Sequence, residues 1–129
     1  MRVLLDTHVV LGLVRRTLST DHPRLAVRLS EPDTESCISV ASLWEIAIKT
    51  RLGKLDPGLP LSDLLGYLRA IGLTVIAITS EQVVAAIEPE PATRDPFDRL
   101  LLAVCLVENL RLVTIDRALV AHPLAAKAS

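Results

Sequence analysis

The sequence predicts an α/β fold of three layers, in which helices cover both faces of a mostly parallel sheet. Short apolar runs alternate with longer segments in which apolar residues recur at helical spacing. The runs are continuous rather than alternating, as is typical of strands that are covered on both faces. Parallel strands bring their carboxyl ends to one edge of the sheet, where such proteins bind their ligands. We therefore expect the functional residues at that edge.

Four apolar runs are predicted to form the strands, namely residues 3–5, 37–40, 74–78 and 112–115. Three long helices are predicted to begin at Val40, Leu61 and the pair Asp95-Pro96. Their expected ends are marked by Gly53, Gly72 and Asn109. Shorter helices are expected over residues 7–15, 23–29, 81–87 and 117–121.

The composition is that of a globular protein with a sizeable core. Hydrophobic residues make up 50% of the 129 residues, which excludes a disordered chain. The length predicts a single domain, residues 1–129. Aromatic residues make up only 2%, too few for a protein that binds single strands by stacking on several rings. Because the net charge is -1, any nucleic-acid binding must depend on a local patch or a bound metal.

The two cysteines belong to no metal or redox motif. Cys37 and Cys105 are far apart in the sequence and are expected to be buried free thiols in a reducing compartment. The first apolar stretch is interrupted by Asp6 and His8, which argues against a signal peptide. No stretch reaches the ~18 apolar residues that a membrane span needs. The sequence therefore predicts a cytoplasmic protein that does not contact membranes.

Four acidic residues stand in apolar surroundings, whereas most of the others lie in polar segments. These four are Asp6, Glu45, Asp98 and Asp116. Two of them follow predicted strands, and the other two lie near the beginning of predicted helices. We expect the parallel topology to bring all four to the same edge of the sheet.

Taken singly, each acid has an ordinary structural explanation. The two that follow strands are suitable helix N-caps. Glu45 precedes Lys49 by four residues, the favourable order for a solvated ion pair on a helix. Asp95 and Asp98 occupy the positions of an N-cap and of an acid in the first helical turn.

Taken together, the four acids favour a metal site. At one sheet edge they would repel one another and raise their own pKa values unless a cation neutralised them. Oxygen ligands without a cluster of Cys or His are suited to Mg²⁺ or Mn²⁺. Such an ion polarises a phosphoryl oxygen and lowers the pKa of an attacking water. The pattern therefore predicts hydrolysis of phosphodiesters, and the sequence contains no glycine-rich motif for nucleotide binding.

Four segments carry a resemblance to a known family. They read LLDTH over 4–8, ISVASLWEI over 38–46, DPFDRLL over 95–101 and LVTID over 112–116. In this order and spacing they resemble PIN-domain ribonucleases and, more narrowly, VapC-type toxins of bacterial or archaeal toxin–antitoxin modules. The resemblance runs from Met1 to about Leu119. It implies a PIN-like α/β/α domain that acts as a metal-dependent endoribonuclease, forms a homodimer and is held inactive by an antitoxin.

The resemblance also implies roles for individual residues. The family's acidic quartet falls on Asp6, Glu45, Asp98 and Asp116. The three aspartates are the expected metal ligands, directly or through water. Glu45 either completes the site or orients the attacking water.

Three further residues are expected to support this site. Thr7 and Thr114 match hydroxyl positions that orient the carboxylates or hold a metal-bound water. Asp95 is expected to cap its helix and to support the site from outside the metal ligands, because Asp98 is the acid that begins the family's helix motif. That motif is Asp-x-x-Leu/Ile-x-Ala, and here one extra residue precedes the alanine.

Basic residues near these motifs are candidates for contacts with RNA phosphates, although exposed helix charges would show the same pattern. They are Lys49, Arg51, Arg94 and Arg99. Trp44 is flanked by apolar residues and is expected in the core or at a dimer interface rather than against a base. The apolar helix surface around it is also expected to anchor the tail of an antitoxin.

The sequence therefore predicts an Mg²⁺- or Mn²⁺-dependent endoribonuclease, the toxin of a type II toxin–antitoxin system with a VapB-type antitoxin as its partner. One alternative is a PIN nuclease of RNA processing or DNA repair that has no antitoxin. Another is a PIN-fold interaction module that has lost catalysis, although the intact acids argue against it. A small open reading frame directly upstream would distinguish a toxin from a processing enzyme.

Overall fold

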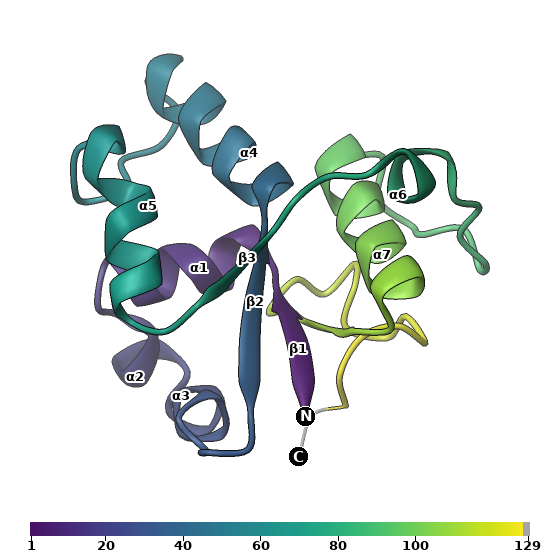
Figure 1. Ribbon diagram of the computed structural model, residues 1–129, viewed down its shortest axis with the longest axis horizontal. Helices are drawn as coiled ribbons and strands as arrows, with labels where there is room; N and C mark the ends of the chain where they lie inside the picture. Colours follow the sequence, from purple (N-terminus) through teal and green to yellow (C-terminus); the bar gives the residue numbers. More distant parts are fainter. Residues whose placement is uncertain (128–129) are drawn as a thin grey trace.

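The computed structural model describes residues 1–127 and shows a four-stranded, wholly parallel sheet (Figure 1). The strand order is β3-β2-β1-β4. The strands are β1 (Arg2–Leu5), β2 (Glu35–Ser39), β3 (Thr74–Ile76) and β4 (Arg111–Val113). This confirms the predicted α/β class and the parallel sheet. The expected domain 1–129 includes two residues, 128–129, that lie outside the described part of the chain.

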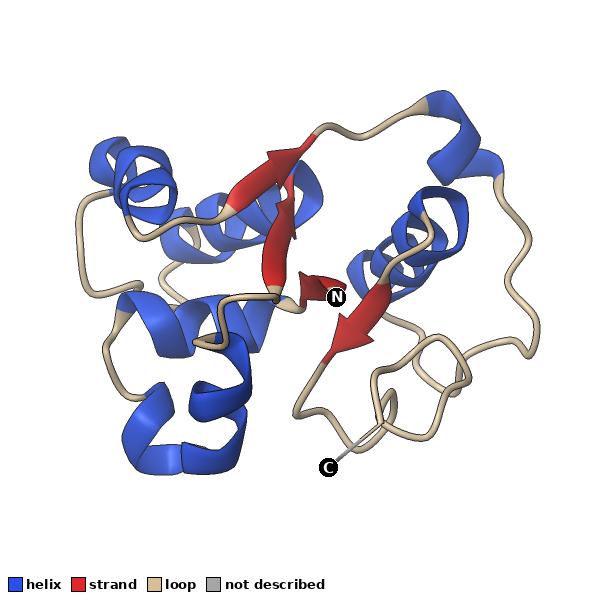
Figure 2. Cartoon of the chain, turned by 60° about the horizontal axis from the view of Figure 1, so that its bottom comes forward, coloured by secondary structure: helices blue, strands red, loops and turns tan. Residues whose placement is uncertain are grey.

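Helices lie on both sides of the sheet, which gives the three layers (Figures 1 and 2). Before β2 the chain forms α1 (Thr7–Val14), α2 (Leu18–Asp21) and α3 (Pro23–Leu29). Between β2 and β4 it forms α4 (Val40–Arg51), α5 (Leu61–Ala70), α6 (Ser80–Val84) and α7 (Pro96–Glu108). In Figure 1, α1, α2, α3 and α5 lie on one side of the strands, and α6 and α7 lie on the other.

Alternation of side chains along the strands divides the core in two. Val3 and Leu5 pack in a cluster with α1 and α5 on one face. Leu4 points to the opposite face and packs with α7, together with its register partners Cys37 and Leu112. Because a strand exposes successive side chains to opposite faces, one apolar run supplies both cores. This explains why β1 is apolar and buried from Val3 to Leu5, after its exposed first residue.

The long helices agree closely with the sequence prediction. Asp95 is the N-cap of α7, and Asn109 ends that helix in the left-handed conformation with φ 56°. Asn tolerates this conformation better than most residues, so it is a suitable helix terminator. Cys37 and Cys105 are both buried free thiols, as predicted.

The predicted helix over 117–121 is wrong, because that segment forms turns. After β4 the chain returns through these turns, and the segment around Ala125 then lies parallel to the edge of the strand at Leu112. The Leu112 N–H donates to the Leu124 carbonyl at 2.9 Å, and the Ala126 N–H donates to the Leu112 carbonyl at 2.7 Å. These bonds satisfy an edge strand that would otherwise expose its backbone. Since only the residues between 113 and 124 connect the two paired segments, the chain must turn tightly there, and a helix over 117–121 does not form.

Two other short elements differ from the prediction. The helix expected over 81–87 is α6, which ends at Val84, because Ala85 adopts an extended conformation and Ile87 enters the second core. The short helix α2 was not predicted, since four residues are too few to show a helical period. Among the described residues, no helix is long and apolar enough to cross a membrane.

Candidate active site

The carboxyl ends of β1 and β4 bring two of the predicted acids to the same edge of the sheet. Asp6 directly follows β1, and its N–H donates to the Val113 carbonyl at 3.0 Å, which continues the pairing with β4. Asp116 lies three residues beyond the end of β4. The neighbouring strand β2 leads directly into α4, whose N-cap Ser39 accepts a hydrogen bond from the Ala41 N–H at 3.0 Å.

Asp6 is buried, with 3% of its surface exposed, and both of its oxygens accept hydrogen bonds. Oδ1 accepts from the Val9 N–H at 2.9 Å, so Asp6 is the N-cap of α1. Oδ2 accepts from the Thr114 hydroxyl. That hydroxyl in turn accepts from the Asp116 N–H at 3.0 Å. Thr114 therefore links the carboxylate after β1 to the turn after β4.

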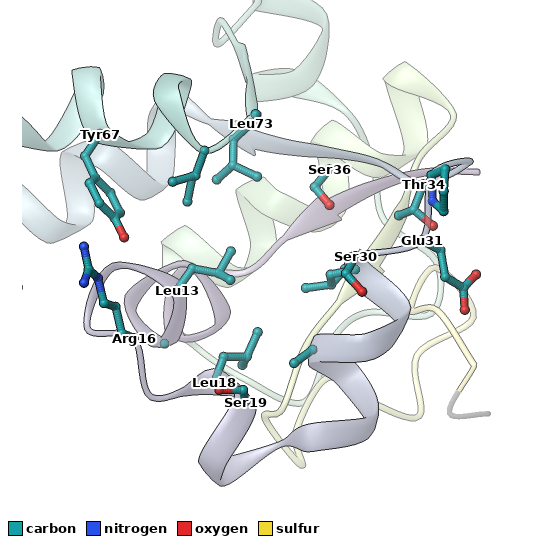
Figure 3. Close-up of a pocket in the computed structure, with 16 residues that line it drawn as sticks. Leu13, Arg16, Leu18, Ser19, Ser30, Glu31, Thr34, Ser36, Tyr67 and Leu73 are labelled. Carbon is teal, nitrogen blue, oxygen red and sulfur yellow. The ribbon is translucent and has the colours of Figure 1, made fainter.

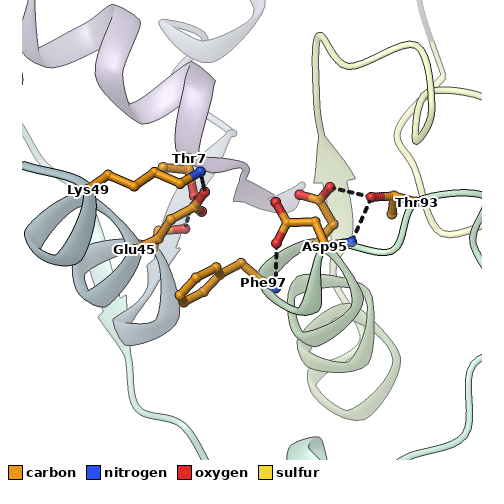
Figure 4. Close-up of polar contacts among 8 residues, drawn as sticks. Thr7, Glu45, Lys49, Thr93, Asp95 and Phe97 are labelled. Atoms are coloured by element: carbon orange, nitrogen blue, oxygen red, sulfur yellow. Dashed lines mark hydrogen bonds and ion pairs between the residues drawn. The ribbon is translucent and has the colours of Figure 1, made fainter. Parts of the chain in front are cut away.

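Glu45 is equally buried, with 3% exposed, although it lies on a helix rather than after a strand. The Thr7 hydroxyl donates to its Oε1 at 2.6 Å, and the Ser42 hydroxyl lies 3.1 Å from that of Thr7 (Figure 4). The Lys49 ammonium donates to Oε2 at 2.5 Å. The predicted pair with Lys49 is confirmed, but its carboxylate is buried rather than solvated.

Asp95 and Asp98 lie at the beginning of α7, and Figure 4 shows Asp95 there beside Thr93. Asp95 accepts from the Phe97 N–H at 2.9 Å, which confirms it as the cap of this helix. The Thr93 hydroxyl donates to Asp98 Oδ2 at 3.1 Å and accepts from the Asp95 N–H at 3.1 Å. A single threonine in the loop before α7 thus orients both the cap and the acid that follows it.

Asp116 also takes part in a local turn. Its Oδ1 accepts from the Ala118 N–H at 2.8 Å. This bond stabilises the turn that follows β4, so Asp116 caps a turn rather than the helix expected after it. Asp116 is half-buried, as is Asp98, so both side chains face the boundary between protein and solvent.

The acids influence one another electrostatically. Burial, together with the charges of Asp95, Asp116 and Glu45, raises the pKa of Asp98 to about 6, although the hydrogen bond from Thr93 lowers it. Burial also raises the pKa of Asp6, with a contribution from Asp116. All four predicted acids are therefore close enough to interact, which is the electrostatic pattern of a functional site.

Two of the four basic residues predicted to surround the site are engaged in ion pairs. Lys49 pairs with Glu45, and Arg99 pairs with Glu90. Arg51 is the last residue of α4, and Arg94 lies in the loop before α7; both are exposed. Arg51 thus follows Glu45 on the same helix, and Arg94 precedes the helix that bears Asp98.

Trp44 is 57% exposed, so the first of its two expected places, the core, is wrong, and the second, a dimer interface, stays a prediction. Its ring packs edge-to-face on Phe97, with ring centroids 5.7 Å apart and an angle of 78° between the planes. Position 44 falls on the outward face of α4, whereas the nearby apolar residues Leu43 and Ile46 pack in the core. The aromatic pair joins α4, which bears Glu45, to the first turn of α7, which bears Asp98.

Sequence reasoning missed three residues that position the site. Ser42 precedes Glu45 by three residues and so shares its helix face, a spacing that could have revealed it. Thr93 lies in a loop without periodicity, and no sequence signal identifies it. Phe97 lies in the first turn of α7, and its contact with Trp44 depends on the packing of two helices.

A pocket of about 610 Å³ lies away from these acids, between α1, α2, α3 and α5 (Figure 3). Its walls are mixed in polarity: Leu13, Leu18 and Leu73 are apolar, whereas polar side chains lie toward both ends. These polar residues are Arg16 and Tyr67 at one end and Ser30, Glu31 and Thr34 at the other. None of the four predicted acids is among the described residues that line it. The candidate chemistry therefore lies at the sheet edge and not in this pocket.

Comparisons with known proteins agree with the fold. The family model of the PIN domain matches residues 3–123. Among the solved structures that are similar to this chain, one is VapBC2 from Rickettsia felis, bound to a DNA fragment from its promoter, and another is a toxin–antitoxin complex from Klebsiella pneumoniae. Each matches with a TM-score of 0.60 and 16% sequence identity, and each match covers 97% of this chain and 96% of the matched chain. The comparison with curated proteins found no match.

PIN domains are nucleases and generally use divalent metal ions. The family match begins within β1 and extends beyond Asp116, so it includes all four acids at the carboxyl edge of the sheet. With this match over nearly the whole sequence and the parallel α/β/α architecture, the chain belongs to the PIN domain family.

Proposed function

We propose that this protein is a metal-dependent endoribonuclease and the toxin of a type II toxin–antitoxin module, of the VapC type. One observation carries the catalytic part of the proposal. Asp6, Glu45, Asp98 and Asp116 interact at one edge of a PIN-family sheet, and burial together with neighbouring charges raises the pKa of Asp98 to about 6. Carboxylates in this arrangement are stabilised by a bound cation.

The chemistry of the donors fits Mg²⁺ or Mn²⁺. The side chains that interact are carboxylates supported by hydroxyls, and these hard oxygen ligands suit both ions. Within residues 1–127, no three His, Cys, Asp or Glu side chains are gathered in a geometry that could already hold a metal. Each carboxylate is instead bonded to protein donors. We infer that Asp6, Asp98 and Asp116 would hold the ion, directly or through water.

When bound, the ion would neutralise charge on the scissile phosphate and lower the pKa of the attacking water. The protein residues provide orientation. Thr114 fixes Asp6, and Thr93 fixes Asp98, so that both carboxylates keep a defined direction. Glu45, held by Thr7, is the residue we assign to completing the site or orienting the attacking water. Asp95 supports the site by capping α7.

RNA binding would depend on local charge, since the net charge of the protein is -1. Arg51 and Arg94 are exposed near the two helices that bear Glu45 and Asp98. Lys49 and Arg99 are already paired with carboxylates. We therefore assign the phosphate contacts chiefly to the two exposed arginines.

The proposed partner is a VapB-type antitoxin. Both similar solved structures are described as toxin–antitoxin assemblies, which supports this partner for a chain of the same fold. An arginine presented to the carboxylates would match their charge, and the exposed Trp44 offers an apolar anchor close to them. We also propose that the protein acts in the cytoplasm as a homodimer and that residues 1–129 form one domain.

The first prediction concerns metal-dependent cleavage. Purified protein should cleave RNA in Mn²⁺ or Mg²⁺ and lose this activity in EDTA. Asp6→Asn should lower the cleavage rate roughly 100-fold or more, because it removes a charged ligand. Since Asn caps helices about as well as Asp, the variant should keep its fold by circular dichroism. Asp63→Asn, at an exposed position on α5, is the matched control and should cleave as the wild type does.

Cleavage that persists in EDTA, or in Asp6→Asn, would show that the proposed metal mechanism is wrong. Unfolding of Asp6→Asn would instead mean that its role is structural.

The second prediction concerns the partner. Expression of the protein alone should arrest growth, and co-expression of its upstream neighbour should restore it. Asp6→Asn should be harmless while still binding that neighbour in a pull-down, because it changes the charge of the site but not the apolar surface. If expression is harmless although RNA is cleaved in vitro, the alternative of a processing or repair nuclease is favoured. A folded protein with neither activity nor partner would favour an inactive interaction module.

The third prediction separates two neighbouring aspartates. Asp95→Ala removes the cap of α7 and should lower the free energy of unfolding by about 1 kcal/mol while leaving substantial activity. Asp98→Ala should abolish most cleavage with little loss of stability. Urea unfolding and RNA cleavage, measured on both variants, test this. An exchange of the two phenotypes would place the metal ligand at Asp95.

The fourth prediction concerns pH. The pKa of Asp98 is about 6 in the folded protein and 3.8 in the reference state, so the folded protein binds more protons between these values. The contribution of Asp98 to stability is therefore present below about pH 4 and is lost as the pH rises through about 6. Asp6, whose pKa is also raised, acts in the same direction. In EDTA, Asp98→Asn should show a weaker fall in stability over this range and should be more stable than wild type at neutral pH. Urea unfolding at several pH values measures this, and identical pH profiles would contradict it.

A further inference from the structure

The pair formed by Glu45 and Lys49 differs from the other ion pairs in the described part of the chain. The side chain of Glu45 is 5% exposed and that of Lys49 is 33% exposed. In the other two pairs, Arg2–Glu35 and Arg99–Glu90, both partners are at least 41% exposed. Exposed pairs contribute little to stability, whereas breaking a buried pair leaves a charge uncompensated. The role of Lys49 therefore needs a separate explanation.

Lys49 and Thr7 together occupy both oxygens of Glu45 (Figure 4). The ammonium lies 2.5 Å from Oε2, and the Thr7 hydroxyl lies 2.6 Å from Oε1. Because these donors come from α4 and α1, they hold the carboxylate in one orientation between the two helices. Glu45 must lose the bond from Lys49 if its Oε2 is to accept another ligand.

The positive charge of Lys49 also lies within the field of the acids on α7. The hydrogen bond that Lys49 donates to Glu45 raises the pKa of Lys49, and the charges of Glu45, Asp95 and Asp98 also raise it, against the opposite effect of burial. Its ammonium is therefore a cation that the protein itself supplies to the acids at this edge of the sheet. A divalent ion in the same place would repel it.

We propose that Lys49 is a positioning residue that acts as a tethered counter-cation of the acidic site, where it competes with the divalent metal and holds Glu45 in its working orientation. This inference rests on the proposed metal-dependent function. It assigns Lys49 to the metal site rather than to the surface that binds RNA phosphates.

A counter-cation of the metal site and a contact for RNA phosphates predict different effects of Lys49→Met. Removal of a tethered counter-cation reduces the repulsion of an incoming Mn²⁺, so Mn²⁺ should bind about tenfold more tightly. The loss of orientation at Glu45 should lower kcat and leave KM for RNA nearly unchanged. A direct phosphate contact would instead raise KM and leave the affinity for Mn²⁺ unaltered. A merely structural role would change the stability without tightening the binding of Mn²⁺.

The experiment measures Mn²⁺ binding by calorimetry and RNA cleavage kinetics for the wild type, Lys49→Met and Lys49→Arg. Lys49→Arg keeps the charge and should stay close to the wild type in Mn²⁺ affinity. Lys54→Met removes the same kind of charge from an exposed position just after α4 and is the matched control. It should bind Mn²⁺ as the wild type does, which would show that the effect is local.

Tighter Mn²⁺ binding and lower kcat in Lys49→Met support the inference. If the wild type binds Mn²⁺ and Lys49→Met binds it with the same affinity, the inference is wrong, while the proposed function stands. If the wild type itself does not bind Mn²⁺, both the metal-dependent function and this inference are wrong.

If Lys49→Met does not fold, Lys49→Gln is measured in its place, because Gln keeps a donor for Glu45 without the charge. If neither variant folds in EDTA, recovery of folding by Mn²⁺ supports the counter-cation role. Failure of Mn²⁺ to restore folding overturns it.

Discussion

Repulsion between carboxylates is the constraint on which this edge of the sheet depends. Four acids interact where parallel strands end, and burial makes their charged forms costly. The protein meets this cost with hydrogen-bond donors: backbone N–H groups at helix starts, hydroxyls of threonines, and one ammonium. Two of the acids in this region, Asp6 and Asp95, are also the N-caps of α1 and α7. The donors at the helix starts therefore satisfy carboxylates of the charged cluster.

Capping and function are therefore not alternatives for Asp6. From the sequence, an aspartate after a strand had two competing interpretations, a helix cap or a member of a functional site. The structure shows that one oxygen caps α1, while the other is held by Thr114 in the interacting group of acids. A carboxylate has two oxygens, and here each serves a different purpose. The same division is seen at Glu45, between Thr7 and Lys49.

Much of the fold could be predicted because its signals are local and periodic. The apolar run of β1, the helical stripe that ends at Asn109, and the position of Asp95 before a proline each follow from short-range rules. The position of Asp6 and Asp116 after neighbouring parallel strands also followed, since parallel connections leave few choices for where strands end. The segment over 117–121 could not be predicted in this way. Its turns are imposed by the distant edge of β4, which needs backbone partners from residues 124 and 126. The exposure of Trp44 and its contact with Phe97 likewise depend on how α4 meets α7.

That contact gives the protein an intrinsic optical probe. The sequence contains one tryptophan, so all tryptophan fluorescence arises from Trp44. Its ring is half in solvent and half against Phe97, a residue whose neighbours in the same helical turn are Asp95 and Asp98. Any movement of α4 against α7 changes the solvent contact of the indole and hence the emission wavelength. Events among the carboxylates can therefore be followed by emission spectroscopy on the unlabelled protein.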